Sequence, residues 1–247
     1  MKTRYLIPTC ALFAMLMSAP VLADEGHEEE HAHYDVSPYL IDGELLVGGL
    51  DHDENHYAPP IYAFGWTFGE GDDPDLLGQD VGAPGYNQKG PTGSLPSDAS
   101  IYVDVVSPLM YWDGTDPVAF SAVTDGTFVQ TGSFSDRKTV NGSGGASDIY
   151  ISDVDADGDI HIHHFTELFG LAPDGIYAMQ MEMELDNTVN SGSVHTSHPF
   201  WIVMNRNLDH HEMHEAMEVL GVPEPGTIGL LLSGLLAVGF TFRRRRA

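Results

Sequence analysis

Cysteine and basic residues are the scarcest features of this sequence. Cys10 is the one cysteine, which excludes an intrachain disulfide framework and a cysteine-based zinc site. Of 247 residues, 10 are Lys or Arg and 37 are Asp or Glu, and the formal net charge is −27. A chain with so few cations cannot neutralise phosphates, which excludes nucleic acid as a partner and disfavours adsorption to anionic lipid.

The common sequence signatures of catalysis are also missing. There is no glycine-rich phosphate loop and no Gly-x-Ser-x-Gly nucleophile elbow. The segment 211–214 reads His-Glu-Met-His, and Glu215 stands where the second histidine of His-Glu-x-x-His is required. Paired carboxylates of a glycoside hydrolase stay open as an alternative, because 37 acids make many pairs and none stands out. We therefore expect a protein that is not an enzyme.

The N-terminal segment predicts export. Lys2 and Arg4 precede an apolar stretch, and residues 21–23 read Val-Leu-Ala, a small-residue cleavage site. Residues 1–23 are therefore predicted to be a signal peptide that signal peptidase removes. Residues 24–33 are acidic and rich in histidine, and we expect them to form a disordered leader. Cleavage leaves a chain without cysteine.

The C-terminal segment predicts a membrane anchor. Residues 227–242 are apolar and uncharged, and Arg243, Arg244, Arg245 and Arg246 follow them. An apolar stretch of this length spans most of a bilayer, and the arginines extend it by reaching the interface. Because basic flanks stay cytoplasmic, the main domain is predicted to lie outside the inner membrane.

Three features in order, Pro223-Glu224-Pro225, the apolar stretch and the arginine cluster, resemble a PEP-CTERM sorting signal over residues 222–247. Such tails occur on otherwise unrelated proteins of Gram-negative bacteria that make extracellular polymer. The resemblance implies recognition by an exosortase, a membrane cysteine protease, and then transfer to the cell surface or extracellular matrix. The same tail carries the label "ice-binding protein C-terminal domain", but the chain has no regular Thr-x-Thr array that would match ice.

The middle of the chain, residues 34–221, predicts one all-β domain, an antiparallel β-sandwich or jelly roll. Short runs of period-two alternation are separated by clusters of Gly and Pro. The clearest runs are 61–68 and 176–185, and others occupy 100–106, 119–123, 127–133, 148–152, 159–165 and 200–204. One short helix is predicted after Asp209 as N-cap, ending at Gly221. Residues 69–96 are predicted to form a long surface loop.

The strongest local motif is Asp153-x-Asp155-x-Asp157-Gly158-Asp159. It resembles the first half of a calcium loop, with oxygen ligands at positions 1, 3 and 5 and glycine at 6. Position 12 lacks the expected glutamate. A hairpin turn at Asp157-Gly158 is the structural alternative. The motif makes Asp153, Asp155, Asp157 and Asp159 candidate ligands for Ca²⁺.

Histidine clusters make a second candidate metal site. His161 and His163 lie two residues apart in a predicted strand and so share one face. His210 and His214 lie four apart in the predicted helix. Neutral imidazoles are ligands for Zn²⁺ or Cu²⁺. The alternative is that these histidines are surface or capping residues.

A sugar-binding role is the third hypothesis. Trp66 and Trp201 lie in alternating strand patterns, which favours core packing. Trp112, in Tyr-Trp-Asp-Gly, is the better candidate for an exposed ring that stacks on extracellular polysaccharide.

The main domain resembles exported β-rich bacterial surface proteins without an established activity, on the runs 158–165, 175–177 and 198–203. Its His-x-His and Gly-x-Tyr pattern is also similar to anchored surface repeats that accompany metal-uptake systems. The sequence therefore predicts a surface or extracellular-matrix protein with a structural or interaction role. A divalent-metal binding protein and a carbohydrate-binding module or hydrolase are the two alternatives.

Overall fold

The computed structural model describes residues 35–50, 56–57, 60–68, 81–82, 85–88, 95–115, 117–124, 126–133, 136–188 and 192–221. The signal peptide, the acidic leader and the sorting signal, predicted at 1–23, 24–33 and 222–247, lie outside the described residues.

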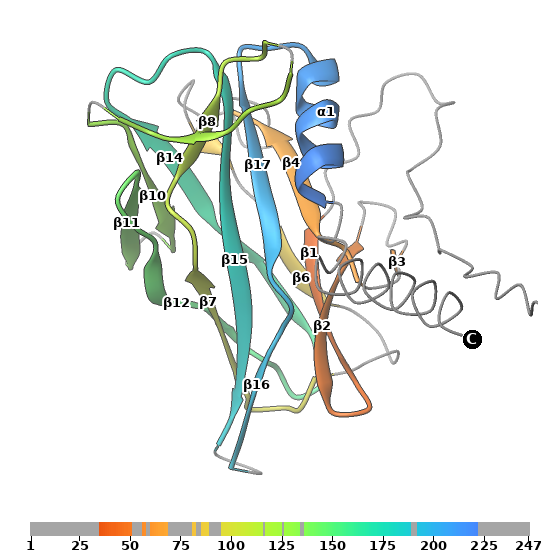
Figure 1. Cartoon of the computed structure of the whole chain (residues 1–247). Helices are drawn as coiled ribbons and strands as arrows, with labels where there is room; N and C mark the ends of the chain where they lie inside the picture. The colour runs from red at the N-terminus through yellow and green to blue at the C-terminus, as the bar shows by residue number, and fades with distance from the viewer. Residues whose placement is uncertain are drawn as a thin grey trace, which may run out of the picture. The chain divides into compact units, whose positions relative to one another are not determined.

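The largest sheet contains the longest strands and follows the order β12-β7-β15-β17-β4, with β16 and β8 also paired to β15 and β9 to β8. Its central strand β15 pairs antiparallel with both β7 and β17 (Figure 1). The strands are β4 (Ala63–Thr67), β7 (Ser100–Val105), β8 (Met110–Trp112), β9 (Ser121–Ala122), β12 (Ala146–Asp153), β15 (Gly175–Asn187), β16 (Ser193–Thr196) and β17 (Phe200–Arg206).

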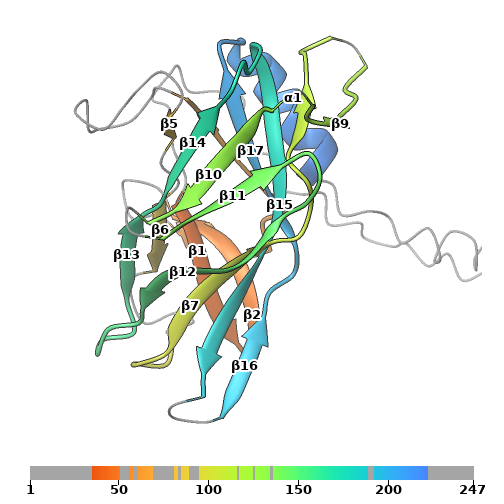
Figure 2. The same ribbon diagram turned by 90° about the vertical axis from the view of Figure 1, so that its left-hand side faces the viewer.

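Two smaller sheets complete the described domain. They are a five-stranded sheet in the order β13-β6-β1-β2-β3 and a four-stranded sheet in the order β11-β10-β14-β5. Figure 2 labels the strands of both sheets except β3, which Figure 1 labels. The strands are β1 (Asp35–Ile41), β2 (Glu44–Leu50), β3 (His56–Tyr57), β5 (Val81–Gly82), β6 (Gly85–Gln88), β10 (Phe128–Gly132), β11 (Arg137–Asn141), β13 (Ile160–His163) and β14 (Phe165–Phe169).

One apolar core lies between the three sheets. Strand β15 places Met179, Met181, Met183 and Leu185 in it, while Glu182 and Glu184 on the alternate positions are partly exposed. The five-stranded and four-stranded sheets contribute in the same way, because every strand with one covered face alternates apolar and polar side chains. The predicted all-β fold, with strands arranged in several sheets, is confirmed.

Most strand pairs are antiparallel, as predicted, but two are parallel. β1 pairs parallel with β6, and β17 pairs parallel with β4. Parallel neighbours require long connections, so strands far apart in sequence become adjacent. The alternation within one strand carries no information on this choice of partner.

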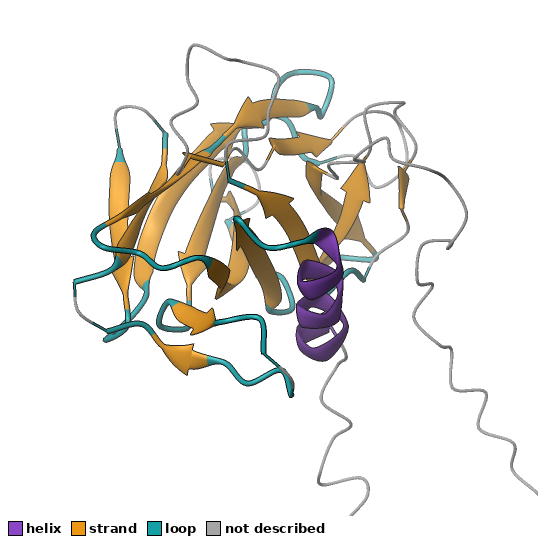
Figure 3. Ribbon diagram, turned by 90° about the horizontal axis from the view of Figure 1, so that it is seen from above, coloured by secondary structure: helices purple, strands orange, loops and turns teal. Residues whose placement is uncertain are grey.

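The predicted C-terminal helix is confirmed as α1 (His210–Gly221). It packs on the outer side of β17 and β4, as the view from above shows (Figure 3). Met213 and Ala216 are buried there in a second apolar cluster with Ile176 and Val203. Consequently the first half of β15 is covered on both faces, whereas its second half is covered on one.

Other predicted strands occur close to their predicted positions, with two differences. The run 159–165 is two strands, β13 and β14, interrupted at His164. The predicted surface loop 69–96 contains β5 and β6, so that prediction was wrong for residues 81–82 and 85–88. Strand β6 lies between β13 and β1, and its Tyr86 and Gln88 are buried. A four-residue strand leaves too short a pattern to stand out between glycines.

Candidate functional site

The aspartate motif forms the connection between two different sheets. β12 ends at Asp153 in the largest sheet, and β13 begins at Ile160 in the five-stranded sheet. The hairpin alternative was therefore wrong, because β12 pairs with β7 and β13 pairs with β6. Gly158 has a φ of 86°, a left-handed conformation that glycine adopts without steric cost.

The side chain of Asp155 stabilises this connection from within. Its Oδ1 accepts hydrogen bonds from the backbone N–H groups of Asp157 and Asp159, both at 2.9 Å. Asp153 points elsewhere, since its Oδ1 accepts a 2.7 Å hydrogen bond from the Ser100 hydroxyl on β7. The Asp155 carboxylate thus forms an Asx-type turn within the loop, whereas the Asp153 carboxylate bonds across to β7.

No group of three or more histidine, cysteine or acidic side chains with metal-binding geometry occurs among the residues that the structure describes. His161 is exposed on β13, and only the backbone of His163 is described, so the pairing of these two imidazoles stays a prediction. On α1 the His211 ring lies 3.3 Å from Glu215, an exposed i,i+4 contact.

We expect Asp155→Ala to destabilise the domain by about 1 kcal/mol, because two backbone N–H groups lose their acceptor. Asp157→Ala is the matched control, since it removes an exposed carboxylate of the same loop but leaves both acceptor bonds in place. Urea unfolding of both variants, with chelator and with Ca²⁺, measures the effect. A loss seen only with Ca²⁺ present would contradict the hydrogen-bond interpretation and restore the calcium hypothesis.

Trp112 is not an exposed sugar-binding ring, and that prediction was wrong. It lies on β8, paired to β15, and is 2% exposed. Its indole N–H donates a 2.7 Å hydrogen bond to the Thr115 carbonyl, and its ring packs near Phe120 in the second cluster. The turn at residues 113–115 folds the chain back toward the ring. A tryptophan before Asp-Gly looks exposed in sequence, but this turn and the pairing to β15 bury it.

His164, between β13 and β14, is a buried histidine that directly follows the candidate pair His161 and His163. It is 1% exposed, and its Nε2 lies 3.2 Å from the Tyr150 carbonyl, to which it donates when protonated on that atom. Its ring contacts Tyr86 edge-on, with centroids 5.3 Å apart. Burial lowers the pKa of His164 to about 4. The imidazole is therefore neutral near pH 7 and does not serve as a surface ligand.

The outward side of β12, β7 and β15, here named the open face, carries a pair of tyrosines at its centre. Tyr102 lies opposite Tyr150 on one side and Glu184 on the other. The two tyrosine rings meet at 66° with centroids 5.7 Å apart, and both are partly exposed. Burial and the nearby Asp153 carboxylate raise the pKa of Tyr150.

Carboxylates flank this tyrosine pair. On β7 and β15, Asp104 lies opposite Glu182, and Ser100 lies opposite Asp186. Burial raises the pKa of Glu184, and the carboxylates of Asp104 and Asp186 raise it further. The acidic residues of the open face are Asp104, Asp148, Asp153, Glu182, Glu184 and Asp186, all partly or fully exposed.

The described basic residues lie on strands other than β12, β7 and β15, with Arg137 and Lys138 on β11 and Arg206 on β17, and each is in an ion pair. Arg137 contacts Glu167 at 2.7 Å, Lys138 contacts Asp136, and Arg206 contacts Asp174, both at 3.3 Å. Within the described part of the chain, therefore, no Lys or Arg is placed to offset the charge of the open face. The sequence indicated alternation along each strand, but it did not indicate that these three strands are neighbours.

The fold and this surface define an all-β domain, and comparison with known proteins identifies the tail. Residues 221–246 match the family model of the PEP-CTERM protein-sorting motif. The chain thus carries the sorting signal of an exported, exosortase-processed protein, as the Pro-Glu-Pro resemblance implied.

The main domain has weaker relatives. Among solved structures it is similar to the ASH/PapD-like domain of human CEP192 (PapD-like domain 7). The identity is 12% and the TM-score 0.35, over 61% of this chain and 85% of that one. The curated proteins contain no match to the chain. In the described part of the chain, α1 is neither long nor apolar enough to cross a membrane. The predicted apolar helix at 227–242 lies outside that part.

Proposed function

We propose that the domain acts at the cell surface or in the extracellular matrix as a binding protein without catalytic activity, and that it binds through the open face. The sorting motif supports its delivery outside the cytoplasm. The observation that carries the binding role is the tyrosine pair, Tyr102 and Tyr150, set among carboxylates on an uncovered stretch of sheet.

The chemistry of this face favours a cationic partner. Carboxylates attract ammonium and guanidinium groups, and tyrosine rings add cation–π attraction for the same groups. Among the described residues, no Lys or Arg stands on the strands of this face. Burial is the main cause of the raised pKa of Glu184, and a basic partner would offset the added repulsion from Asp104 and Asp186. The occupant we propose is a segment of another surface protein that is rich in Lys or Arg. The two rings meet at 66° and do not form one flat platform of the kind that stacks on a sugar.

We expect the triple variant Glu182→Gln, Glu184→Gln, Asp186→Asn to bind a synthetic peptide of alternating Lys and Gly about ten-fold more weakly than the natural sequence does. The expected loss corresponds to about 1.4 kcal/mol, the size of a few partly exposed charge contacts. Fluorescence anisotropy of the labelled peptide at near-physiological salt measures the affinity. A Glu–Gly peptide of equal length should not bind.

A charge-matched control distinguishes binding at the open face from general attraction to the net charge of the protein. The variant Glu44→Gln, Asp157→Asn, Glu218→Gln removes three exposed carboxylates outside the open face and reaches the same net charge. It should lose less than about three-fold in affinity, as long-range attraction through salt is weak. Equal losses in the two triple variants would show attraction to net charge alone and would end the proposal. Tyr150→Leu should weaken binding without changing the charge.

A further inference from the structure

The match to the sorting motif begins at the last residue of α1, Gly221. Val222 is the one residue between the helix and Pro223. The apolar stretch begins at Thr227, and the six Cα–Cα steps from Gly221 to Thr227 can span only about 20 Å when fully extended. The segment to be processed thus has almost no linker on its domain side.

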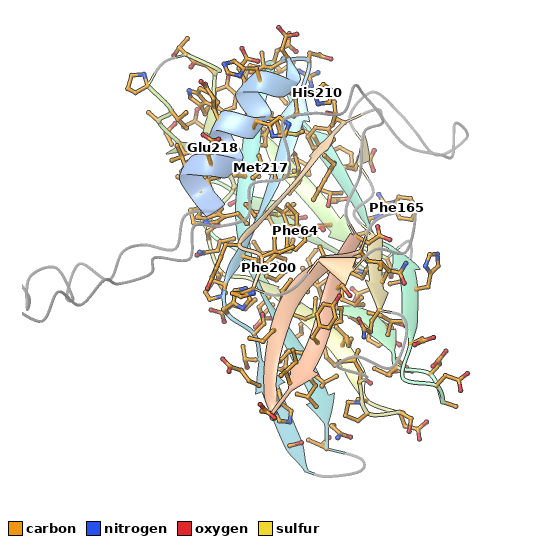
Figure 4. All side chains as sticks on the ribbon, turned by 90° about the vertical axis from the view of Figure 1, so that its right-hand side faces the viewer. Phe64, Phe165, Phe200, His210, Met217 and Glu218 are labelled. Atoms are coloured by element: carbon orange, nitrogen blue, oxygen red, sulfur yellow. The ribbon has the colours of Figure 1, made fainter. Side chains whose placement is uncertain are left out.

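The final turn of α1, residues 217–221, is packed against the sheet. Met217 and Leu220 are partly buried in the second apolar cluster. Gly65 on β4 leaves room for the helix, because a Cβ there would overlap the sulfur of Met217. A Cβ on Gly221 would lie 3.2 Å from the Cβ of Ala63, so the helix end also approaches β4 closely. Figure 4 shows α1 alongside β4, with Met217 on the side toward the strand.

Neighbouring residues of this turn face solvent. Glu218 and Val219 are exposed, and 55% of the Val219 surface is accessible. Anchoring of the turn therefore depends on Leu220 and Met217 and not on every apolar residue in it. Leu220 and Val219 are suited to a comparison of variants. Both lie just before the residues that match the sorting motif, but only Leu220 packs against the second apolar cluster.

Proteases act on chain that is locally opened and not on packed helix, and the cleavage rate follows the population of the open form. Helix ends open more readily than cores, at a cost set by the apolar contacts they lose. A protease that binds residues on both sides of Pro223-Glu224-Pro225 meets the final turn of α1 directly.

We propose that the final turn of α1 is part of the processing site and must unwind before the membrane protease can engage the sorting motif. The inference rests on the proposed sorting of this protein. On this proposal, the packing of Leu220 limits the rate at which the domain is processed and released from the membrane.

The test is pulse-chase processing of the full chain in a bacterium that makes an exosortase. Leu220→Ala should speed conversion to the shorter form about five-fold. Loss of a half-buried leucine side chain should increase the equilibrium population of the unwound turn by about ten-fold or less. Val219→Ala should change the rate less than two-fold. Circular dichroism of the purified domain, residues 24–222, checks that both variants remain folded.

A second variant keeps the inference testable if Leu220→Ala does not fold. Insertion of Gly-Ser-Gly-Ser between Gly221 and Val222 supplies extended chain without opening the helix, and it should speed processing to a similar extent. Normal processing of the natural sequence with no acceleration in either variant would overturn the inference. If the natural chain is not processed, and Glu224→Ala leaves this unchanged, the proposed sorting itself fails.

Discussion

Gly145→Ala should destabilise the domain by about 3 kcal/mol, the upper end of the usual cost of overpacking. Gly145 immediately precedes β12, where the chain crosses the backbone of β7 at close range. A Cβ on Gly145 would overlap the carbonyl oxygen of Val105. That oxygen belongs to main chain in the largest sheet and cannot move aside as a flexible side chain would, so the sheet must shift.

Gly144→Ala is the control for this prediction. A Cβ on Gly144 has no atom within 4 Å, and its φ is not in the left-handed region. The substitution should be neutral or stabilise by up to about 1 kcal/mol by restricting the unfolded chain. Urea unfolding midpoints of the two variants measure the difference. Similar stabilities for both would contradict the close approach of residue 145 to β7.

Acid should selectively weaken the protein through His164. Burial lowers the pKa of its imidazole to about 4, against about 6.5 in an unfolded chain. Its surroundings are the edge of the Tyr86 ring and the Tyr150 carbonyl, neither of which is an anion that would stabilise the charged form. The folded state therefore favours neutral His164, whereas the unfolded state takes up the proton readily.

The pH window follows from the direction of this shift. A histidine with a depressed pKa contributes its full stability above about pH 6.5, and this contribution is lost as the pH falls toward 4. The loss by pH 4 amounts to about 3 kcal/mol, since each pKa unit is worth 1.36 kcal/mol. Acid also relieves repulsion among the many carboxylates, so the histidine contribution has to be isolated by difference.

His164→Gln isolates it, because glutamine can donate to the Tyr150 carbonyl but does not titrate. The stability of the natural protein relative to this variant should fall by about 3 kcal/mol between pH 7 and pH 4 in chemical denaturation. His161→Gln, at an exposed position on β13, is the control for replacing a histidine of this strand by glutamine. A constant gap between the natural protein and His164→Gln would show that His164 is not buried as a neutral group.

Local sequence signals predicted much of the fold. Period-two alternation identified β15, including which of its residues reach the core, because one face of that strand is covered along its whole length. The N-cap at Asp209 and the Met213 stripe identified α1. β6 escaped detection because its pattern is only four residues long and lies among glycines.

The candidate sites were predicted less well. Asp155 has the spacing of a calcium ligand, but it accepts hydrogen bonds from its own loop. Trp112 has the setting of an exposed ring, but pairing of β8 with β15 buries it. In both cases the residue type indicated which interactions the side chain can make. Which interaction it does make depended on neighbours that are distant in sequence or on the path of a turn.

The sequence by itself determined the presence of a sorting motif at the C-terminal end and the class of the fold. The sorting motif and the strand periodicity each occupy a continuous stretch of chain, so both can be recognised without knowing the tertiary contacts. Only the tertiary structure decided that Tyr102, Tyr150 and Glu184 lie side by side, that His164 is buried, and that α1 packs up to the first residue of the sorting motif. These features depend on which strands pair and in what register, and an alternating pattern fits many pairings equally well.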